Sequence, residues 1–462
     1  MKRLFKTYHQ QWPLYLLLAA FYFLPYSVAA PTVKQQAEFF SIYHRVGGLV
    51  SIWDALLAIA FLHLLLRSLI ARQLRLSLGR PENAWGLAAI MVFGFTVGLL
   101  HVEGMPLGYG TTEAKRAVIA GLPAVYLCLM YFLTINYLKT REQAVQAARW
   151  MILLSLLLIV YGIVRFCLIL AGVIATMRPF GLPIVLYDQM TMLYPFIFAV
   201  PAVHLLTRNA EGRNYELRWR HWMLWGAAVL LILLSARRFN YLLLVAGLMF
   251  VLLAGPALNW WRARQSWRVF VKGTFALAVL FFLLRGFVPE SITGVARAVQ
   301  SLDMASEIGL QHGGDIRRAE IKNMFANMER RPYAYVIGMG LGTKWQEITE
   351  QPLDSFSYPK SYLAISRGWF PQFHLPYLAL LYRFGILGLL ALLVWLMFYL
   401  RSRARDLQLL NAPEMRAFGL GMLIFLALNL TNLGDSANPT AAILAGVCMG
   451  LLERLSLQSG LD

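Results

Sequence analysis

Residues 151–175 read MILLSLLLIVYGIVRFCLILAGVIA, an apolar run interrupted by a single charged residue, Arg165. About 20 apolar residues in a helix cross the hydrocarbon core of a bilayer. Runs of this kind recur along the whole 462-residue chain, which is 59% hydrophobic and only 14% charged. A soluble protein of this size needs more charge to cover its surface, so the sequence predicts an all-α polytopic membrane protein.

Twelve such runs, each of about 15–24 residues, are predicted to span the membrane. They lie near residues 13–30, 50–69, 84–101, 117–138, 150–173, 189–207, 222–236, 239–257, 270–288, 377–400, 415–432 and 438–454. We therefore expect nine spans in a membrane domain at 1–288, a large and partly helical loop domain at 289–376, and three further spans at 377–462.

The orientation follows from the short loops on one side of these spans, which hold about half of the 42 Lys and Arg residues. By the positive-inside rule these loops face the cytoplasm. Both termini are then cytoplasmic, and the loop at 289–376 is extracytoplasmic. The net charge of +19 is explained by this topology and by anionic lipid, so it does not indicate a nucleic-acid partner.

The N-terminus has a second interpretation. Its basic start, its apolar run and Val28-Ala29-Ala30 are similar to a cleaved signal peptide. Cleavage there would leave the orientation of every later span unchanged.

Several arginines lie where the bilayer disfavours charge, at a cost of about 3 kcal/mol each on insertion scales. Arg237 and Arg238 occupy the outer turn of a tight hairpin, where two planar guanidinium groups suit the oxygens of a phosphate. Contact with lipid headgroups is the alternative. Arg165 is either part of a site, a structural partner of Asp188, or a side chain that reaches to the outer surface. Arg383 flanks the large loop, and it either contributes to the same positive site as Arg237 and Arg238 or contacts lipid headgroups.

The large loop contains one clear helical pattern at residues 315–330. Ile321, Met324, Phe325 and Met328 recur at helical spacing and predict one apolar face. Pro332 is expected to stop this helix. The other faces then present Arg317, Arg318, Glu320 and Lys322.

Two shorter segments follow the predicted loop helix. In Gly338-Met339-Gly340-Leu341-Gly342 the alternating glycines permit close backbone approach and free amide donors, or else a tight turn that packs on the helix. His374 begins the tenth span, either as a polar cap or as a site residue beside the basic cluster.

These segments, in this order, resemble the O-antigen ligase and polymerase superfamily. The likeness rests on Ser235 to Arg238, on Arg318-Ala319-Glu320-Ile321, on the glycine segment, on His374-Leu375-Pro376-Tyr377-Leu378, and on Arg383-Phe384-Gly385-Ile386-Leu387-Gly388. Leu375, Lys322 and Ala236-Arg237 depart from the family pattern, which commonly has Asn, Trp and Gly-Ser there.

The resemblance implies a GT-C-like membrane glycosyltransferase without a nucleotide-sugar domain, located in the bacterial inner membrane with its active site facing the periplasm. Its partners would be a glycan donor linked to undecaprenyl diphosphate, an acceptor that is either another lipid-linked glycan or lipid A–core, and membrane lipids. No cofactor or metal is expected, because no Asp/Glu cluster with metal-ligand spacing stands in the outer loops.

On this basis we assign roles to single residues. Arg238, Arg237 and Arg318 would hold the diphosphate, and His374 would act as general base or orient the acceptor. Glu320 or Asp315 is the alternative base. The wider candidate site comprises Arg165, Arg317, Gly338, Gly340, Gly342 and Tyr377.

Three functions remain open. Within the family, a polymerase of O-antigen or exopolysaccharide repeat units is favoured slightly over a ligase that transfers the glycan to lipid A–core in lipopolysaccharide. The third alternative is a polysaccharide transporter or lipid flippase. Transporters often show matching halves, and this sequence shows no such repeat.

Overall fold

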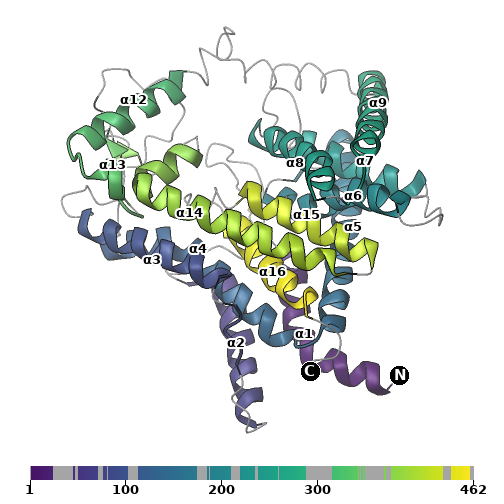
Figure 1. Ribbon diagram of the computed structural model, residues 1–462, viewed down its shortest axis with the longest axis horizontal. Coiled ribbons are helices and arrows are strands. Elements are labelled where there is room, and N and C mark those ends of the chain that lie inside the picture. The colour runs from purple at the N-terminus through teal and green to yellow at the C-terminus, as the bar shows by residue number, and fades with distance from the viewer. Residues whose placement is uncertain are drawn as a thin grey trace.

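The computed structural model describes residues 2–23, 45–46, 50–70, 76–80, 82–101, 113–173, 185–186, 188–209, 219–234, 238–258, 260–287, 315–341, 343, 345–346, 348, 369–370, 376–410, 412–429 and 439–457. This part of the chain is mainly helical (Figure 1). The helices at the predicted spans are α1 (Lys2–Phe23), α2 (Ile52–Ile70), α3 (Ala84–His101), α4 (Glu113–Tyr137), α5 (Arg141–Leu170), α6 (Tyr194–Asn209) with the preceding 3-10 turn η2 (Asp188–Leu193), α7 (Trp219–Leu233), α8 (Arg238–Ala257), α9 (Ala263–Phe287), α14 (Pro376–Gln408), α15 (Pro413–Asn429) and α16 (Pro439–Leu455).

Every predicted span overlaps one of these helices, and residues 24–30, 235–236 and 430–432 of the predicted spans lie outside the described residues. Six helices in the described residues are long and apolar enough to cross a bilayer, and shorter apolar helices lie at Gln11–Phe23, Gly121–Tyr137 and Trp219–Leu233. The chain is thus a helical, multi-pass membrane protein. The full number of twelve crossings and their orientation stay predictions.

Glycines let the central helices approach closely. A Cβ atom at Gly446 of α16 would fall within 3.0 Å of the Leu127 carbonyl of α4. A Cβ atom at Gly421 of α15 would fall within 3.0 Å of the Pro195 carbonyl of α6. Membrane helices lack a strong hydrophobic driving force for association, so close backbone contact at small residues supplies much of their packing energy.

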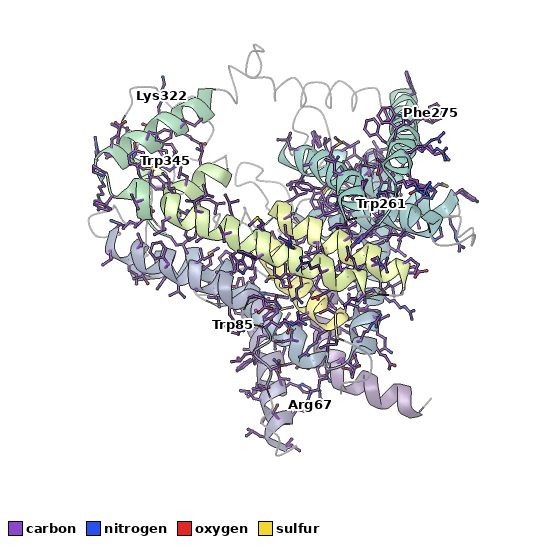
Figure 2. All side chains as sticks on the ribbon, in the orientation of Figure 1. Arg67, Trp85, Trp261, Phe275, Lys322 and Trp345 are labelled. Carbon is purple, nitrogen blue, oxygen red and sulfur yellow. The ribbon has the colours of Figure 1, made fainter. Side chains whose placement is uncertain are left out.

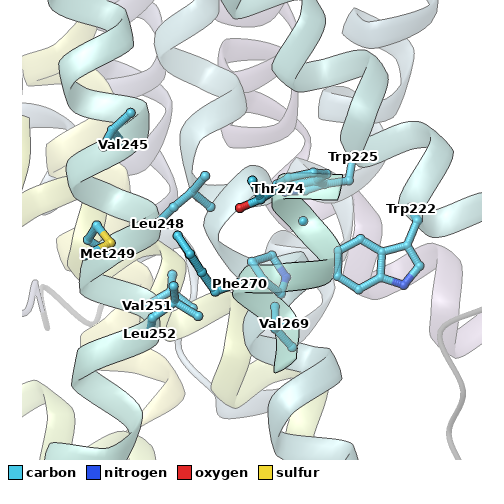
Figure 3. A pocket seen from close by; sticks show the side chains of 12 residues that line it. Trp222, Trp225, Val245, Leu248, Met249, Val251, Leu252, Val269, Phe270 and Thr274 are labelled. Atoms are coloured by element: carbon cyan, nitrogen blue, oxygen red, sulfur yellow. The ribbon is translucent and has the colours of Figure 1, made fainter. Parts of the chain in front are cut away.

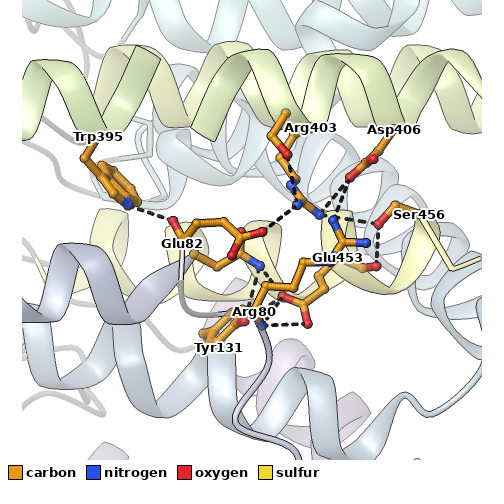
Figure 4. A network of polar contacts seen from close by, with 10 residues as sticks. Arg80, Glu82, Tyr131, Trp395, Arg403, Asp406, Glu453 and Ser456 are labelled. Carbon is orange, nitrogen blue, oxygen red and sulfur yellow. Dashed lines mark hydrogen bonds and ion pairs between the residues drawn. The ribbon is translucent and has the colours of Figure 1, made fainter. Parts of the chain in front are cut away.

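A polar network joins the start of α3 to α4, α14 and α16 (Figure 4). The buried Glu453 carboxylate accepts hydrogen bonds from Tyr131, at 2.6 Å, and from Asn83. Arg403, which is 1% exposed, pairs with Asp406 at 2.9 Å and with Glu82 at 3.8 Å. By the predicted topology this network lies at the cytoplasmic ends of the helices.

Two loop helices and two antiparallel strand pairs complete the described chain. The loop helices are α12 (Asp315–Glu329) and α13 (Ala334–Ile337). Strand β1 (Arg45–Val46) pairs with β2 (Val50–Ser51), and β3 (Trp345–Gln346) pairs with β4 (Trp369–Phe370), both antiparallel. Figure 1 shows α12 and α13 grouped beside the first turns of α14 and the end of α3.

The predicted loop helix is confirmed, and its buried face was predicted in part. Met324 and Met328 are fully buried as expected, whereas Phe325 is 36% exposed. The buried face instead includes Asn323 and Asn327. Figure 2 shows Lys322 on the outward side of α12, with Trp345 on the inward side.

The two asparagines are buried because they bind the backbone of the β3 segment. Asn327 donates to the Gln346 carbonyl at 2.6 Å and accepts from the Gln346 amide at 3.1 Å. Asn323 accepts from the Ile348 amide at 2.7 Å. Buried amide side chains are tolerated where they satisfy backbone groups in this way, and hydrophobic periodicity cannot detect them.

Candidate functional site

The glycine segment of the loop is clamped between α3 and α14. The amides of Met339 and Gly340 donate to the carbonyls of Tyr382 and Arg383 at 2.6 and 2.8 Å. The Leu341 amide donates to the Gly94 carbonyl of α3 at 2.8 Å. The loop therefore bridges two membrane helices through its own backbone.

Only glycine fits the closest points of this clamp. Gly338 and Gly340 have φ angles of 77° and 84°. A Cβ atom at Gly340 would fall within 3.0 Å of the Gly98 backbone, and one at Gly338 would fall within 3.0 Å of the Arg383 backbone. The expectation of free amide donors is wrong for residues 338–341, because all four amides donate to carbonyls of the protein. The tight-packing alternative describes them correctly.

Helix α14 is broken where the loop docks. Gly385 has φ 63° and ψ −172°, which are not helical values. A Cβ atom there would meet the carbonyl of Val336, at the other side of the clamp. A break in a helix changes the bonding of nearby carbonyls, and the Tyr382 and Arg383 carbonyls at this break accept the loop amides. The Arg383 side chain is 2% exposed, so it lies inside the protein rather than among lipid headgroups.

A histidine at the end of α3 contacts the short segment between α12 and α13. The His101 ring stacks on Tyr333 with ring centroids 5.3 Å apart, and its Nε2 atom lies 2.9 Å from the Tyr333 hydroxyl oxygen. His101 is 7% exposed and Tyr333 is 48% exposed, so the pair reaches from the helix to the surface. Sequence reasoning missed it. The available signal was a histidine at the predicted outer end of the apolar run 84–101.

This clamp lies inside a segment with a known family match. Residues 222–393 match the profile of the O-antigen ligase family. That segment is an O-antigen ligase domain. The resemblance to the O-antigen ligase and polymerase superfamily is thereby confirmed, and the chain is a membrane glycosyltransferase of the ligase or polymerase type. No curated protein matches the chain.

The ligase domain contains most of the predicted site. It runs from α7 to α14 and includes the α7–α8 turn, the loop helix α12, the glycine clamp and the His374 segment. Arg238 is the first residue of α8, and Arg317 and Arg318 lie in the first turn of α12. Helix N-termini carry a partial positive charge, which adds to that of these arginines.

Glu320 differs from its predicted environment. Its side chain is 1% exposed and lies on the buried face of α12 rather than on an outward face. A buried carboxylate is poorly placed to meet a bulky acceptor. The burial of Glu320 therefore argues against this residue as the base.

Arg165 lies on α5, before the ligase domain. Its Nη1 atom donates to the Tyr161 hydroxyl at 3.4 Å, one turn earlier on the same helix. Asp188, its predicted partner, is the first residue of η2. Their pairing stays a prediction, as does a contact of Arg165 with substrate.

The other predicted site residues are placed only in part. Tyr377 is the second residue of α14. Arg237, Gly342 and His374 lie outside the described residues. Among the described residues, no group of three or more His, Cys, Asp and Glu side chains is arranged to hold a metal ion.

Proposed function

We propose that the protein moves a glycan from undecaprenyl diphosphate to an acceptor hydroxyl at the periplasmic face of the inner membrane, polymerising surface polysaccharide repeat units. The observation that carries the glycan-transfer part of this proposal is the ligase domain at residues 222–393, which contains both candidate arginine segments. Each of these segments opens a helix, α8 at Arg238 and α12 at Asp315.

The reaction develops negative charge on the leaving group. The acceptor oxygen attacks the anomeric carbon, the bond from that carbon to the diphosphate oxygen breaks, and the bonding electrons leave with the diphosphate. Fixed cations stabilise that charge more in the transition state than in the ground state, which lowers the barrier. Arg238, Arg237 and Arg318 would supply these cations without a metal.

The acceptor hydroxyl must lose its proton as the new bond forms. His374 would take this proton or orient the acceptor. We favour His374 over Glu320 for this role because the Glu320 carboxylate is buried. The clamp of residues 338–341 would fix the loop helix α12 and the start of α14 relative to α3.

Transfer to lipid A–core, the ligase reaction, is the second candidate, and the description of the matched family favours it. The departures at Leu375 and Lys322 favour the polymerase. A flippase is not supported, because its function does not require a glycosyltransferase domain.

The test uses single-site variants expressed in a host strain that lacks the native protein. Arg238→Ala and His374→Ala are expected to abolish surface polysaccharide while retaining normal protein levels, because one removes a diphosphate cation and the other the acceptor-side group. Arg264→Ala is the matched control, since this exposed arginine near the start of α9 lies on the predicted cytoplasmic side. Normal polymer from both site variants would refute the assignment.

A further inference from the structure

An apolar pocket lies between α7, α8 and α9, with Pro201 of α6 at its wall (Figure 3). Its volume is about 170 Å³. Trp222, Trp225, Leu248 and Phe270 are among the side chains that surround it. The Trp225 indole already donates to the Ile197 carbonyl at 3.0 Å, so that polar group does not need a ligand.

An exposed apolar stripe on α8 leads to this pocket. Leu242, Val245 and Met249 are 54%, 61% and 45% exposed. They follow Arg238 by four, seven and eleven residues, which places all four positions on one face of the helix. Val245 and Met249 also line the pocket. The stripe is therefore continuous from the first residue of α8 to the pocket.

The depth of the pocket selects the kind of molecule that fits. A helix rises about 1.5 Å per residue, so Leu252, the last lining residue on α8, lies about 21 Å along the helix axis from Arg238. Half of a hydrocarbon core is about 15 Å. A ligand with its headgroup at Arg238 must reach past the bilayer midplane to fill the pocket, which the acyl chains of an outer-leaflet phospholipid do not do.

We infer that this stripe and pocket hold the polyprenyl chain of the donor lipid, an inference that rests on the proposed function. Arg238 would bind the anionic headgroup, and the long isoprenoid chain would follow Leu242, Val245 and Met249 into the pocket. Apolar contact with the chain would provide binding energy and keep the diphosphate at the head of α8. Donors with short lipid chains are then expected to bind more weakly.

The test measures binding separately from glycan transfer. Purified protein in phosphatidylethanolamine nanodiscs is irradiated with undecaprenyl diphosphate that carries a photoreactive group on an isoprene unit about 21 Å along the chain from the diphosphate, and the labelled peptides are identified by mass spectrometry. We expect adducts on the α8 and α9 segments that contain Met249 and Phe270. Unlabelled undecaprenyl diphosphate should compete, whereas phosphatidylglycerol should not.

A variant that fills the pocket provides the matched comparison. Gly273 lines the pocket, and a Cβ atom there would meet nothing within 4 Å. Gly273→Phe should reduce labelling about tenfold, which corresponds to the loss of about two buried methylene groups. Gly226→Phe is the control, because Gly226 is equally open but does not line the pocket.

The outcomes of this experiment test the polyprenyl site and the proposed glycan transfer separately. Adducts elsewhere, equal competition by phosphatidylglycerol, or labelling unaffected by Gly273→Phe would overturn the polyprenyl site. Specific labelling of the pocket in a protein that transfers no glycan from a complete donor would instead contradict the proposed function and leave the lipid site standing.

Discussion

Substitution of Gly340 by alanine is expected to detach the large loop from helices α3 and α14. Gly340 adopts a φ angle of 84°, which costs a non-glycine residue on the order of 1–3 kcal/mol. The added Cβ atom would also fall within 3.0 Å of the Gly98 backbone. Backbone atoms cannot rotate away as a flexible side chain can, so the loop and α3 must separate.

The size of this destabilisation follows from the two backbone hydrogen bonds that the separation breaks. The hydrogen bonds from Gly340 to the Arg383 carbonyl and from Leu341 to the Gly94 carbonyl are both 2.8 Å long. Each contributes about 1 kcal/mol net. Together with the backbone strain, Gly340→Ala should destabilise the docked loop by about 3–5 kcal/mol.

Limited proteolysis measures this effect directly. Cleavage of the loop between α9 and α14 should accelerate in Gly340→Ala, and surface polysaccharide should fall although the membrane helices stay folded. Gly226→Ala is the control, because a Cβ atom there meets nothing within 4 Å and alanine favours the helix by up to about 1 kcal/mol. Wild-type proteolysis and polymer in Gly340→Ala would refute the clamp.

Two further predictions concern the membrane core. Gly446→Leu should lower thermal stability in detergent by about 1–3 kcal/mol, because its side chain must push α16 away from the Leu127 carbonyl of α4; an unchanged melting temperature would contradict that packing. Glu453→Ala should leave the Asn83 amide and the Tyr131 hydroxyl without their buried acceptor, which destabilises the folded protein by about 1–3 kcal/mol for each group. Glu453→Gln, which keeps an acceptor oxygen, should be less damaging. Equal stability of the wild type and both variants would show that the network does not contribute to stability.

The helices were predictable because each is formed by a contiguous apolar run, which the sequence shows directly. Each apolar run coincides with a helix, and the loop helix was predicted to lie between Asp315 and Pro332. The buried face of α12 was not predictable, since Asn323 and Asn327 are buried by bonds to residues about twenty positions later.

The candidate site was predictable in its segments but less so in its contacts. Motif order located the glycine segment and the arginines within what proved to be a ligase domain. It did not reveal that the break at Gly385 provides the docking point, or that His101 meets Tyr333 across 232 positions of sequence. Such contacts depend on tertiary packing, which local patterns do not encode.

The most direct test of the central claim is the profile of lipid-linked glycans in the native host after deletion of the gene. We expect undecaprenyl-diphosphate-linked single repeat units to accumulate at the periplasmic face, since the protein that joins them is absent. Accumulated long chains would identify the ligase alternative. Glycans that remain at the cytoplasmic face, or an unchanged profile with normal surface polysaccharide, would contradict glycan transfer by this protein.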